Sequence, residues 1–415
     1  MHSTDVSSRG LPDLGSVKRI LIVRLSAIGD VVHALPLASA LKDAYPHLEI
    51  TWLVEEIPAD MVLGNPDLHD VIVLPRSRWK RGRTRSPRVW AEYLAFLGEL
   101  RRRRFDVTID LQGYAKSALL ALATGARYRL GWWRLRDGAN LVSRALPRLP
   151  TSIHRVDWFL DVARALGIPN PGVRFPLHIP IQARESIAAR LASAGIAGGR
   201  TFVVMNQAAG NPPRRWARQR FGELALEMAL RFGLPTVLIG TTPEAADCEA
   251  VVEQVRTGLE ARIGGDGLAP LNLAGATTLK ETAALLDSCA LHVSGDTGST
   301  HIAAALGTPV VAFYGSSDPA HAGPWGQFDH VLARRDLCSP ACTVRQCAYS
   351  VMDGGSAGAL TSAALASTDA GDPLLSSARC LNAIIVEEAL VKVEEVLTAT
   401  YSQSHPSFDH GVGSL

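Results

Sequence analysis

The chain has 415 residues, enough for two domains of ordinary size, each with its own hydrophobic core. Apolar residues make up 47% and charged residues 20%, a balance that is typical of a folded, soluble protein and excludes a disordered one. The formal net charge of +2 excludes an overall nucleic-acid signature, and no window of about eighteen apolar residues predicts a membrane span. The N-terminus has no apolar core, so we expect no signal peptide and a cytoplasmic protein.

Strand and helix patterns alternate through the first half of the chain, after residues 1–17, which we expect to form a flexible tail. Residues 19–25 are a near-continuous apolar run, as expected for a strand covered on both faces. Residues 31–42 follow with a helical pattern. The later elements predicted in this half are strands at 50–55, 71–74 and 105–110, an amphipathic helix at 90–104 and a helix that opens at 112–117.

The turn after the first strand carries a candidate general base, Asp30. This turn lacks both the G-x-G-x-x-G of a dinucleotide site and the G-K-[ST] of a P-loop, so those two chemistries are disfavoured. Open α/β sheets place their ligands beyond the carboxyl ends of the strands, where Asp30 is predicted to lie. A carboxylate at this position can accept a proton from an attacking hydroxyl. The alternative is that Asp30 only caps the helix.

Residues 76–88 contain seven Lys or Arg and no acidic residue. The simplest interpretation is a solvated loop. The sharper interpretation is a clamp for an anionic partner such as lipid phosphates, with Trp79 and Trp90 resting at a membrane surface. Peripheral contact with the cytoplasmic face of the inner membrane is therefore expected from this hypothesis. Nucleic acid is disfavoured, because this is one patch on a near-neutral protein.

Six prolines between residues 147 and 180 thin out the regular structure, so we place a domain boundary near residue 180. The second half again alternates strand and helix, which predicts two doubly wound halves with ligands in the cleft between them. Its predicted strands are 201–205 and 235–239, and its predicted helices are 185–194, 218–232, one that Glu244 opens, and 278–288 with a Thr cap.

Two adjacent arginines, Arg214 and Arg215, end the polar loop of residues 206–216. Guanidinium groups pair bidentately with phosphate oxygens and keep their charge, so these residues are candidates for binding a diphosphate. The alternative is that they are surface arginines ahead of a helix.

Residues 291–315 are predicted to form a strand, a tight turn, a helix and another strand. The turn is Gly295-Asp296-Thr297-Gly298-Ser299, and the short helix starts at His301. Such a turn can aim backbone N–H groups and a helix dipole at an anion. Because Asp296 should repel a phosphate, we expect the backbone to hold the anion, while Asp296 orients the loop or contacts a ribose hydroxyl. The alternative is that Thr297 or Ser299 only caps the helix and Asp296 bonds its first turn.

The late cysteines Cys338, Cys342, Cys347 and Cys380 could hold zinc, but their spacing is not the paired C-x-x-C of a zinc ribbon. Structural packing is favoured over a metal or redox pairing, and no metal site is predicted. The C-terminal elements predicted are a low-complexity, Gly-, Ala- and Ser-rich insertion at 351–379, a helix at 383–400 and a flexible tail at 401–415.

Three stretches, ILIVRLSAIGDVVHALPLASAL, RRWARQRFGELA and GDTGSTHIAAALGTPVVAFYGSSDP, together resemble glycosyltransferase family 9, the ADP-heptose:lipopolysaccharide heptosyltransferases. The resemblance runs over residues 18–347 and again from Cys380. It implies the α/β GT-B fold, with two Rossmann-like doubly wound domains facing a central cleft. Residues 18–180 would then be the acceptor-binding domain and residues 181–400 the nucleotide-sugar donor-binding domain.

The resemblance also implies roles for individual residues. Asp30 matches the general base, and Arg214 stands where the family usually has a Lys that contacts the donor diphosphate. The family often has hydroxyl side chains near residues 208–210, where this chain has Ala208-Ala209-Gly210. The other positions carried over are Asp296, Thr297 and Gly298 for the donor loop, His301 for its helix, Glu244 for the ribose hydroxyls, and Lys116 and His154 for the acceptor.

The activity implied is inverting transfer of heptose from ADP-heptose to an anionic lipopolysaccharide inner-core acceptor, Kdo-lipid A or heptosyl-Kdo-lipid A. ADP is a good leaving group, so no strong general acid is needed, and one base suffices for a single displacement. No cofactor is expected. One alternative is a same-fold enzyme that uses another nucleotide sugar, either another glycosyltransferase or a nucleotide-sugar epimerase. The other is a non-catalytic binding protein.

Overall fold

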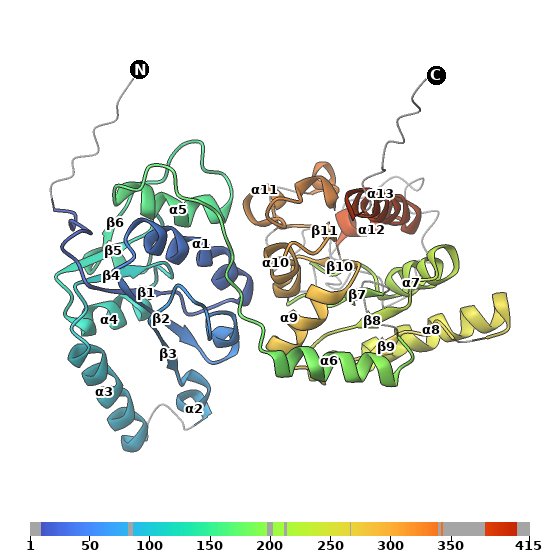
Figure 1. Cartoon of the computed structure of the whole chain (residues 1–415), viewed down its shortest axis with the longest axis horizontal. Helices are drawn as coiled ribbons and strands as arrows, with labels where there is room; N and C mark the ends of the chain where they lie inside the picture. Colours follow the sequence, from blue (N-terminus) through green and yellow to red (C-terminus); the bar gives the residue numbers. More distant parts are fainter. Residues whose placement is uncertain are drawn as a thin grey trace, which may run out of the picture. The chain divides into compact units, whose positions relative to one another are not determined.

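The computed structural model describes residues 10–81, 86–196, 202–210, 214–265, 267–338, 342 and 378–404. The chain divides into two compact units, Met1–Pro180 and Ile181–Leu415 (Figure 1). Each unit is built on one parallel sheet of six strands.

The N-terminal unit has the strand order β3-β2-β1-β4-β5-β6. This is the order of a doubly wound fold, in which the chain moves outward from β1, returns, and moves outward again from β4. The first strand reads RILIV and is buried from its second residue onward, as its continuous apolar run predicted. The strands are β1 (Arg19–Val23), β2 (Glu49–Glu55), β3 (Asp70–Leu74), β4 (Val107–Asp110), β5 (Tyr128–Gly131) and β6 (Arg144–Ala145).

Helices cover both faces of this sheet. Crossovers between parallel strands are right-handed, so the helices after β1 and β4, which lead in opposite directions, lie on opposite faces. Accordingly α1 packs against α5 on one side, and α3 packs against α4 on the other (Figure 1). The helices are α1 (Ile28–Ala44), α2 (Arg76–Arg81), α3 (Pro87–Arg102), α4 (Ala115–Thr124) and α5 (Arg155–Ala165).

Three features of this unit differ from the sequence-based expectation. Of the expected flexible tail at residues 1–17, the structure describes the part from Gly10 onward. Leu14 and Val17 are buried there, so this part is packed and is not a loose tail. The basic run of residues 76–88 begins with the helix α2 instead of a loop. The proline-rich region contains α5, whose buried side chains include Val156, Phe159 and Leu160, because its prolines flank the helix and do not interrupt it.

The C-terminal unit has the strand order β12-β11-β10-β7-β8-β9. Read from β7, this is the same doubly wound order as in the N-terminal unit, with β7 and β10 in the places of β1 and β4. The strands are β7 (Val203–Asn206), β8 (Thr236–Leu238), β9 (Leu271–Asn272), β10 (Leu291–Gly295), β11 (Val310–Tyr314) and β12 (Val331–Ala333).

The predicted Thr cap of residue 278 is confirmed, because its hydroxyl accepts a hydrogen bond from the backbone N–H of Glu281 at 3.2 Å. The short helix expected from His301 begins three residues earlier, at Gly298. The helices are α6 (Ile181–Ser193), α7 (Arg218–Phe232), α8 (Ala245–Ile263), α9 (Leu279–Ser288), α10 (Gly298–Ala305), α11 (Pro319–Ala322), α12 (Arg379–Asn382) and α13 (Val386–Ser404).

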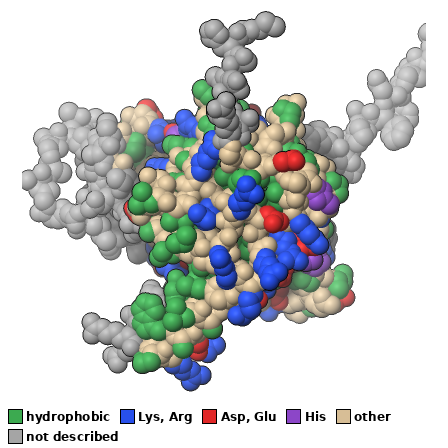
Figure 2. Space-filling view, turned by 90° about the vertical axis from the view of Figure 1, so that its left-hand side faces the viewer, with side chains coloured by type: hydrophobic (Ala, Val, Ile, Leu, Met, Phe, Trp, Pro, Cys, Tyr) green, Lys and Arg blue, Asp and Glu red, His purple; other side chains and the backbone are tan. Residues whose placement is uncertain are grey.

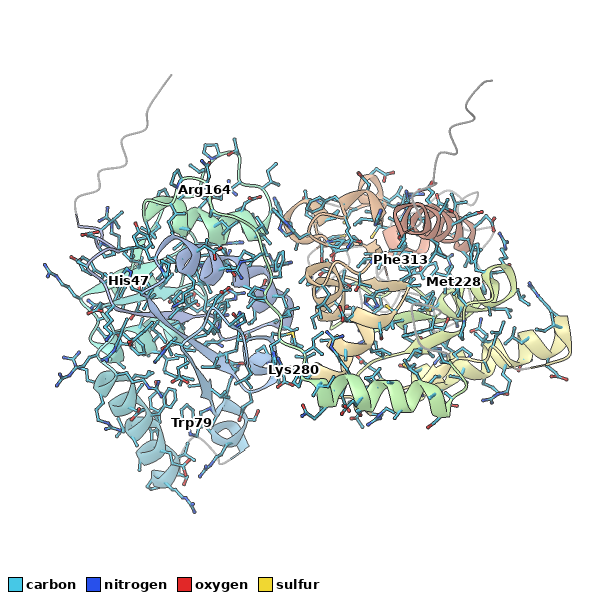
Figure 3. The ribbon with its side chains drawn as sticks, viewed as in Figure 1. His47, Trp79, Arg164, Met228, Lys280 and Phe313 are labelled. Atoms are coloured by element: carbon cyan, nitrogen blue, oxygen red, sulfur yellow. The ribbon has the colours of Figure 1, made fainter. Side chains whose placement is uncertain are left out.

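The core of the C-terminal unit joins the sheet to α7, α8 and α13. Phe313 on β11 and Met228 on α7 both lie in it (Figure 3). Trp216 stacks on Phe313 with ring centroids 4.2 Å apart, and its indole N–H donates to the carbonyl of Ile384 at 2.9 Å. The chain segment just before α13 is thereby tied to the loop before α7.

Residues 351–377 of the predicted insertion lie outside the described residues. Cys347 and residues 405–415 also lie outside them. The described part of α13 runs to Ser404, four residues into the expected C-terminal tail. Among the described helices, none combines the length and the hydropathy that a bilayer crossing requires.

Candidate active site

Both units place polar residues at their topological switch point, the crevice where the strand order reverses and where doubly wound sheets bind ligands. In the N-terminal unit this point lies between β1 and β4, and Asp30 follows β1. In the C-terminal unit it lies between β7 and β10, where Ser294 pairs in register with Asn206 and Asp296 follows at once.

Asp30 lies in the first turn of α1 and is held by two arginines. Its Oδ2 forms an ion pair with the guanidinium of Arg24, and its Oδ1 accepts a hydrogen bond from Nη1 of Arg155. Arg24 directly follows the last residue of β1, and Arg155 is the first residue of α5. The carboxylate is therefore oriented through both oxygens by cations from two different elements.

The two arginines differ in how firmly they are fixed. The side chain of Arg24 is 6% exposed, its Nη1 donates to the carbonyl of Leu111 at 2.6 Å, and its guanidinium lies 5.5 Å from the ring centroid of Phe159. The side chain of Arg155 is 40% exposed. Arg24 is thus a fixed partner of Asp30, whereas Arg155 borders solvent.

A pocket of about 140 Å³ adjoins Asp30. Among the described residues that line it, the charged ones are four arginines and Asp30, so the pocket carries an excess of positive charge. Aromatic side chains form much of the remaining wall. The lining residues are Arg24, Asp30, Gln112, Tyr114, Trp132, Arg134, Arg136, Arg155, Trp158 and Phe159.

The turn after β4 is organised by a buried carboxylate, Asp110. It accepts hydrogen bonds from the backbone N–H groups of Gln112 and Gly113 and from the hydroxyl of Ser117, each at 2.9 Å. Burial raises the pKa of Asp110, and these hydrogen bonds oppose the rise. Gln112 in turn accepts from the backbone N–H of Leu25 at 3.0 Å, which links this turn to the one that leads to Asp30.

The two predicted acceptor residues do not line this pocket. Lys116 lies at the start of α4 and pairs with Glu55 at 3.3 Å. His154 is buried and is the N-cap of α5, where its Nδ1 accepts from the backbone N–H of Val156 at 3.2 Å. The neighbour of His154, Arg155, reaches Asp30 instead.

The basic run of residues 76–88 is partly neutralised. Arg76 pairs with Glu55 at 2.8 Å, and Arg78 pairs with Glu92 at 2.6 Å. Trp79, which was expected at a membrane surface, is part of α2 and packs against α3, with its ring centroid 5.3 Å from that of Tyr93 (Figure 3).

Trp90 is 54% exposed on α3, as the membrane-surface hypothesis required. The face of the N-terminal unit in Figure 2 also shows more Lys and Arg than Asp and Glu side chains. A wider hollow, of about 940 Å³, lies at the amino ends of β1 and β4, the opposite end of these strands from Asp30. Its lining includes Arg19, Arg101, Arg102, Arg104 and Arg127.

In the C-terminal unit, Asp296 forms an ion pair with Arg214, and its other oxygen lies 3.5 Å from Nε2 of His301. The Asp296 side chain is 8% exposed. Gly295 permits the backbone of Arg214 to approach closely, because a Cβ at residue 295 would lie 3.1 Å from the carbonyl oxygen of Arg214. The structure thus brings together three predicted donor-binding residues from two segments of the chain.

Thr297 is the N-cap of α10, but in the described part of the chain its hydroxyl makes no capping bond to the first turn. It lies instead 2.9 Å from the hydroxyls of Ser294 and Ser299 and 3.2 Å from that of Thr300. The hydroxyl of Thr297 therefore does not cap the backbone N–H groups in the first turn of α10, which starts at Gly298.

A buried histidine supports this hydroxyl cluster. His292 on β10 has its Nδ1 3.0 Å from the carbonyl of Val204 and its Nε2 3.1 Å from the hydroxyl of Ser299. Burial lowers the pKa of His292 to about 4, so the ring is neutral near pH 7. A neutral ring that donates from Nδ1 and accepts at Nε2 satisfies both contacts.

The two remaining predicted donor residues have local partners. Glu244 accepts from the backbone N–H of Thr241 at 2.7 Å, as part of a capping box before α8. Arg215 donates from Nε to the carbonyl of Ala209 at 2.8 Å, which fixes the loop after β7.

The described cysteines are reduced, and no group of three or more metal-ligating side chains occurs among the described residues. Burial, with a hydrogen bond to the thiol of Cys342, raises the pKa of Cys338 to about 11.

The profile of Glycosyltransferase family 9 (heptosyltransferase) matches residues 93–352. The lipopolysaccharide core heptosyltransferase OpsX of Haemophilus influenzae is 26% identical over 318 residues, covering 76% of this chain and 84% of the relative. Lipopolysaccharide heptosyltransferase 1 of Escherichia coli K12 is 27% identical over 324 residues, covering 74% of this chain and 91% of the relative.

Solved structures show the same fold. The glycosyl transferase family 9 protein of Veillonella parvula gives a TM-score of 0.69 at 22% identity, over 94% of this chain and 99% of that one. The E. coli heptosyltransferase WaaC with ADP-2-deoxy-2-fluoro heptose gives 0.58 at 27% identity, over 72% of this chain and 90% of that one.

The two doubly wound units, each with polar residues at its switch point, together with this similarity, define a glycosyltransferase of the GT-B fold. The predicted fold class is therefore confirmed. Because the matching profile covers more than half of its length, the chain belongs to glycosyltransferase family 9.

Sequence reasoning missed the cations of the pocket, Arg24, Arg134, Arg136 and Arg155, and the buried His292. For two of these residues the sequence did carry a signal. Arg24 is a charged residue within a run otherwise apolar, which requires a specific partner in a buried strand. His292 likewise interrupts a buried apolar strand.

Proposed function

We propose that this protein transfers heptose from ADP-heptose to an anionic inner-core acceptor of lipopolysaccharide, with inversion at the anomeric carbon. The observation that carries the proposal is the pair of switch-point sites in one chain. One presents an oriented carboxylate beside a cationic pocket, and the other presents a guanidinium beside a helix N-terminus.

The C-terminal unit supplies the donor site in this proposal. The diphosphate of the donor accepts hydrogen bonds from the first backbone N–H groups of α10 and from Arg214. As the bond between the anomeric carbon and the phosphate oxygen breaks, the charge that develops on ADP is stabilised by these groups. Asp296 and His301 position Arg214, and Glu244 contacts the ribose through the carboxylate oxygen that is not used in its capping box.

The N-terminal unit supplies the base. Asp30 accepts the proton of the acceptor hydroxyl, whose oxygen forms the new bond to the anomeric carbon. The electron pair of the broken bond leaves with ADP, so atoms and charge balance without a metal ion or another reactant. Displacement from the face opposite the leaving group inverts the anomeric centre.

The names of the relatives support the choice of substrates. The E. coli protein with ADP-2-deoxy-2-fluoro heptose is a heptosyltransferase, and the two curated relatives are heptosyltransferases of lipopolysaccharide. The four arginines beside Asp30 favour an acceptor with anionic groups over a neutral glycan. The exposed Trp90 and the Lys- and Arg-rich face of Figure 2 support peripheral contact with an anionic membrane surface.

The test is ADP release by the purified full-length protein, supplied with ADP-heptose and either Kdo-lipid A or heptosyl-Kdo-lipid A. We expect ADP release that depends on one of these acceptors, and a product heavier by one heptose with an inverted linkage. Turnover with UDP-sugars and none with ADP-heptose would replace the proposed donor. Absence of turnover with every donor and acceptor, despite nucleotide binding, would indicate a binding protein.

A further inference from the structure

Each oxygen of Asp30 is paired with a guanidinium group, so an acceptor hydroxyl has to share either oxygen with a cation in this arrangement. Movement of one of the two arginines would give the proposed base an oxygen that it does not share with a cation. Arg24 is a poor candidate, because its side chain is buried and is anchored on the carbonyl of Leu111. Arg155, exposed to 40%, is the partner that can leave.

The backbone of Arg155 stays in place while its side chain moves. Arg155 is the first residue of α5, and the N-cap His154 fixes that end of the helix through the N–H of Val156. Helix α5 also packs against α1, which carries Asp30. Rotation about the side-chain bonds alone can therefore carry the guanidinium from Asp30 into the adjoining pocket, which it already lines.

An anion entering that pocket would compensate for the loss of Asp30 as a partner. Arg134 and Arg136 line the pocket with Arg155, so an anion there meets three guanidinium groups. A carboxylate is the closest match, because Arg155 then exchanges one carboxylate for another with little net change in free energy.

We propose that Arg155 is a positioning residue that exchanges partners: it holds Oδ1 of Asp30 while the acceptor is absent, and moves to a carboxylate of the acceptor sugar when the acceptor binds. This inference rests on the proposed function, because it needs Asp30 as the base. It also names the acceptor chemistry, a sugar acid whose carboxylate lies near the reacting hydroxyl.

The exchange explains how the enzyme would limit hydrolysis of its donor. With Arg155 on Oδ1, Asp30 is a poor base toward water. The arriving acceptor removes Arg155 from Oδ1, and the acceptor hydroxyl gives its proton to that oxygen. An acceptor without the carboxylate leaves Arg155 in place and is activated poorly.

The experiment compares two acceptors, a Kdo-bearing acceptor with its carboxylate intact and the same molecule as the primary amide. For the wild type we expect kcat/KM to be about 10- to 100-fold lower with the amide, since a hydrogen bond between charged groups is lost. For Arg155→Met we expect this ratio to shrink to about twofold, mainly through a higher KM for the carboxylate acceptor. Arg155→Lys should restore part of the ratio.

The second readout is ADP release without any acceptor. We expect Arg155→Met to raise this hydrolysis about threefold or more, because Oδ1 is then no longer paired with the Arg155 cation and can accept a proton from water. The rise should disappear in the double variant Asp30→Asn/Arg155→Met. The matched control is Arg127→Met, which removes an exposed arginine at the other end of the same sheet and should change neither readout.

Two results would overturn the exchange. Equal losses with both acceptors in Arg155→Met, with no rise in hydrolysis, would mean that Arg155 only supports the local structure. An unchanged acceptor ratio would mean that it never contacts the carboxylate. If instead Asp30→Asn transfers heptose at the wild-type rate, the proposed base itself is wrong, so the two failures are distinguishable.

Discussion

Arg214 forms an ion pair with Asp296 across the switch point of the C-terminal unit, although 82 positions separate the two residues in the chain. Asp296 is buried to more than nine-tenths, so its charge requires this partner. The pair explains how an acidic residue can stand in a loop proposed to bind a diphosphate. Asp296 orients the cation, and the cation meets the phosphate.

Replacing Arg214 should weaken donor binding more than it changes the chemical step. We expect Arg214→Met to raise the KM for ADP-heptose about 10- to 100-fold, because a hydrogen bond between charged groups is lost. Arg214→Lys should have a smaller effect, because it keeps the charge but loses the bidentate geometry. Steady-state kinetics with varied donor measures both.

The matched control for Arg214 is Arg215→Met, because Arg215 contacts the loop carbonyl of Ala209. We expect its effect on donor KM to be clearly smaller. Since Arg214→Met also leaves Asp296 without its cation, the double variant Arg214→Met/Asp296→Asn separates a folding defect from a binding defect. If donor KM is unchanged in Arg214→Met, Arg214 does not contact the diphosphate.

Asp30→Asn should reduce kcat about 1,000-fold while leaving ADP affinity unchanged, because a general base typically contributes two to four orders of magnitude. Transfer assays and ADP titration calorimetry on the same preparation measure the two quantities. A thermal unfolding curve is the control, because the buried Arg24 loses its ionic partner in this variant. Transfer near the wild-type rate would exclude Asp30 as the base.

Gly295→Ala should lower donor affinity about threefold or more through the backbone alone. The new methyl group would lie 3.1 Å from the carbonyl oxygen of Arg214, closer than carbon and oxygen ordinarily approach, so the Arg214 segment must shift. Gly265→Ala is the control, because no heavy atom lies within 4 Å of a Cβ there. Equal ADP affinity in both variants would show that the position of this segment does not matter for the donor.

The stability of the C-terminal unit should fall in mild acid because of His292. Its pKa is lowered by burial to about 4, from 6.5, so between these values the unfolded chain binds a proton that the folded chain does not. We expect this residue alone to cost about 2 kcal/mol of unfolding free energy between about pH 7 and about pH 5. The stability is regained as the pH rises through 6.5.

Urea unfolding of wild type and His292→Gln at both pH values tests this. Glutamine offers an N–H to the carbonyl of Val204 and an oxygen to the hydroxyl of Ser299, but it does not titrate. The difference between the two proteins should therefore change with pH by about 2 kcal/mol. A constant difference would mean that His292 is not the group responsible.

The sequence was sufficient for the doubly wound fold, because its evidence is local. Apolar runs such as that of β1 and the caps and stops around α9 and α10 are written in consecutive residues. Helix α5 was missed because prolines cluster on both sides of it, and their density obscured a helical segment that contains none.

The candidate site was only half predictable, because a sequence pattern shows local features but not contacts between distant segments. Asp30 and Asp296 occupy recognisable turns, but their partners Arg155 and Arg214 come from segments far away in sequence. No periodicity in the chain links such pairs. His154, which was predicted to contact the acceptor, caps a helix in the structure, while the adjacent Arg155 reaches the carboxylate of Asp30.

Helix α13 fills one wall of the C-terminal core, with Leu390, Val393 and Val396 buried, although the matching family profile ends at residue 352. The indole of Trp216, two residues beyond Arg214, is anchored 168 positions downstream at Ile384. Trimming the protein at the edge of the recognisable family sequence would therefore remove the brace behind the nucleotide loop. Substitutions or truncations in α13 should therefore lower the affinity for ADP before they lower the solubility of the protein.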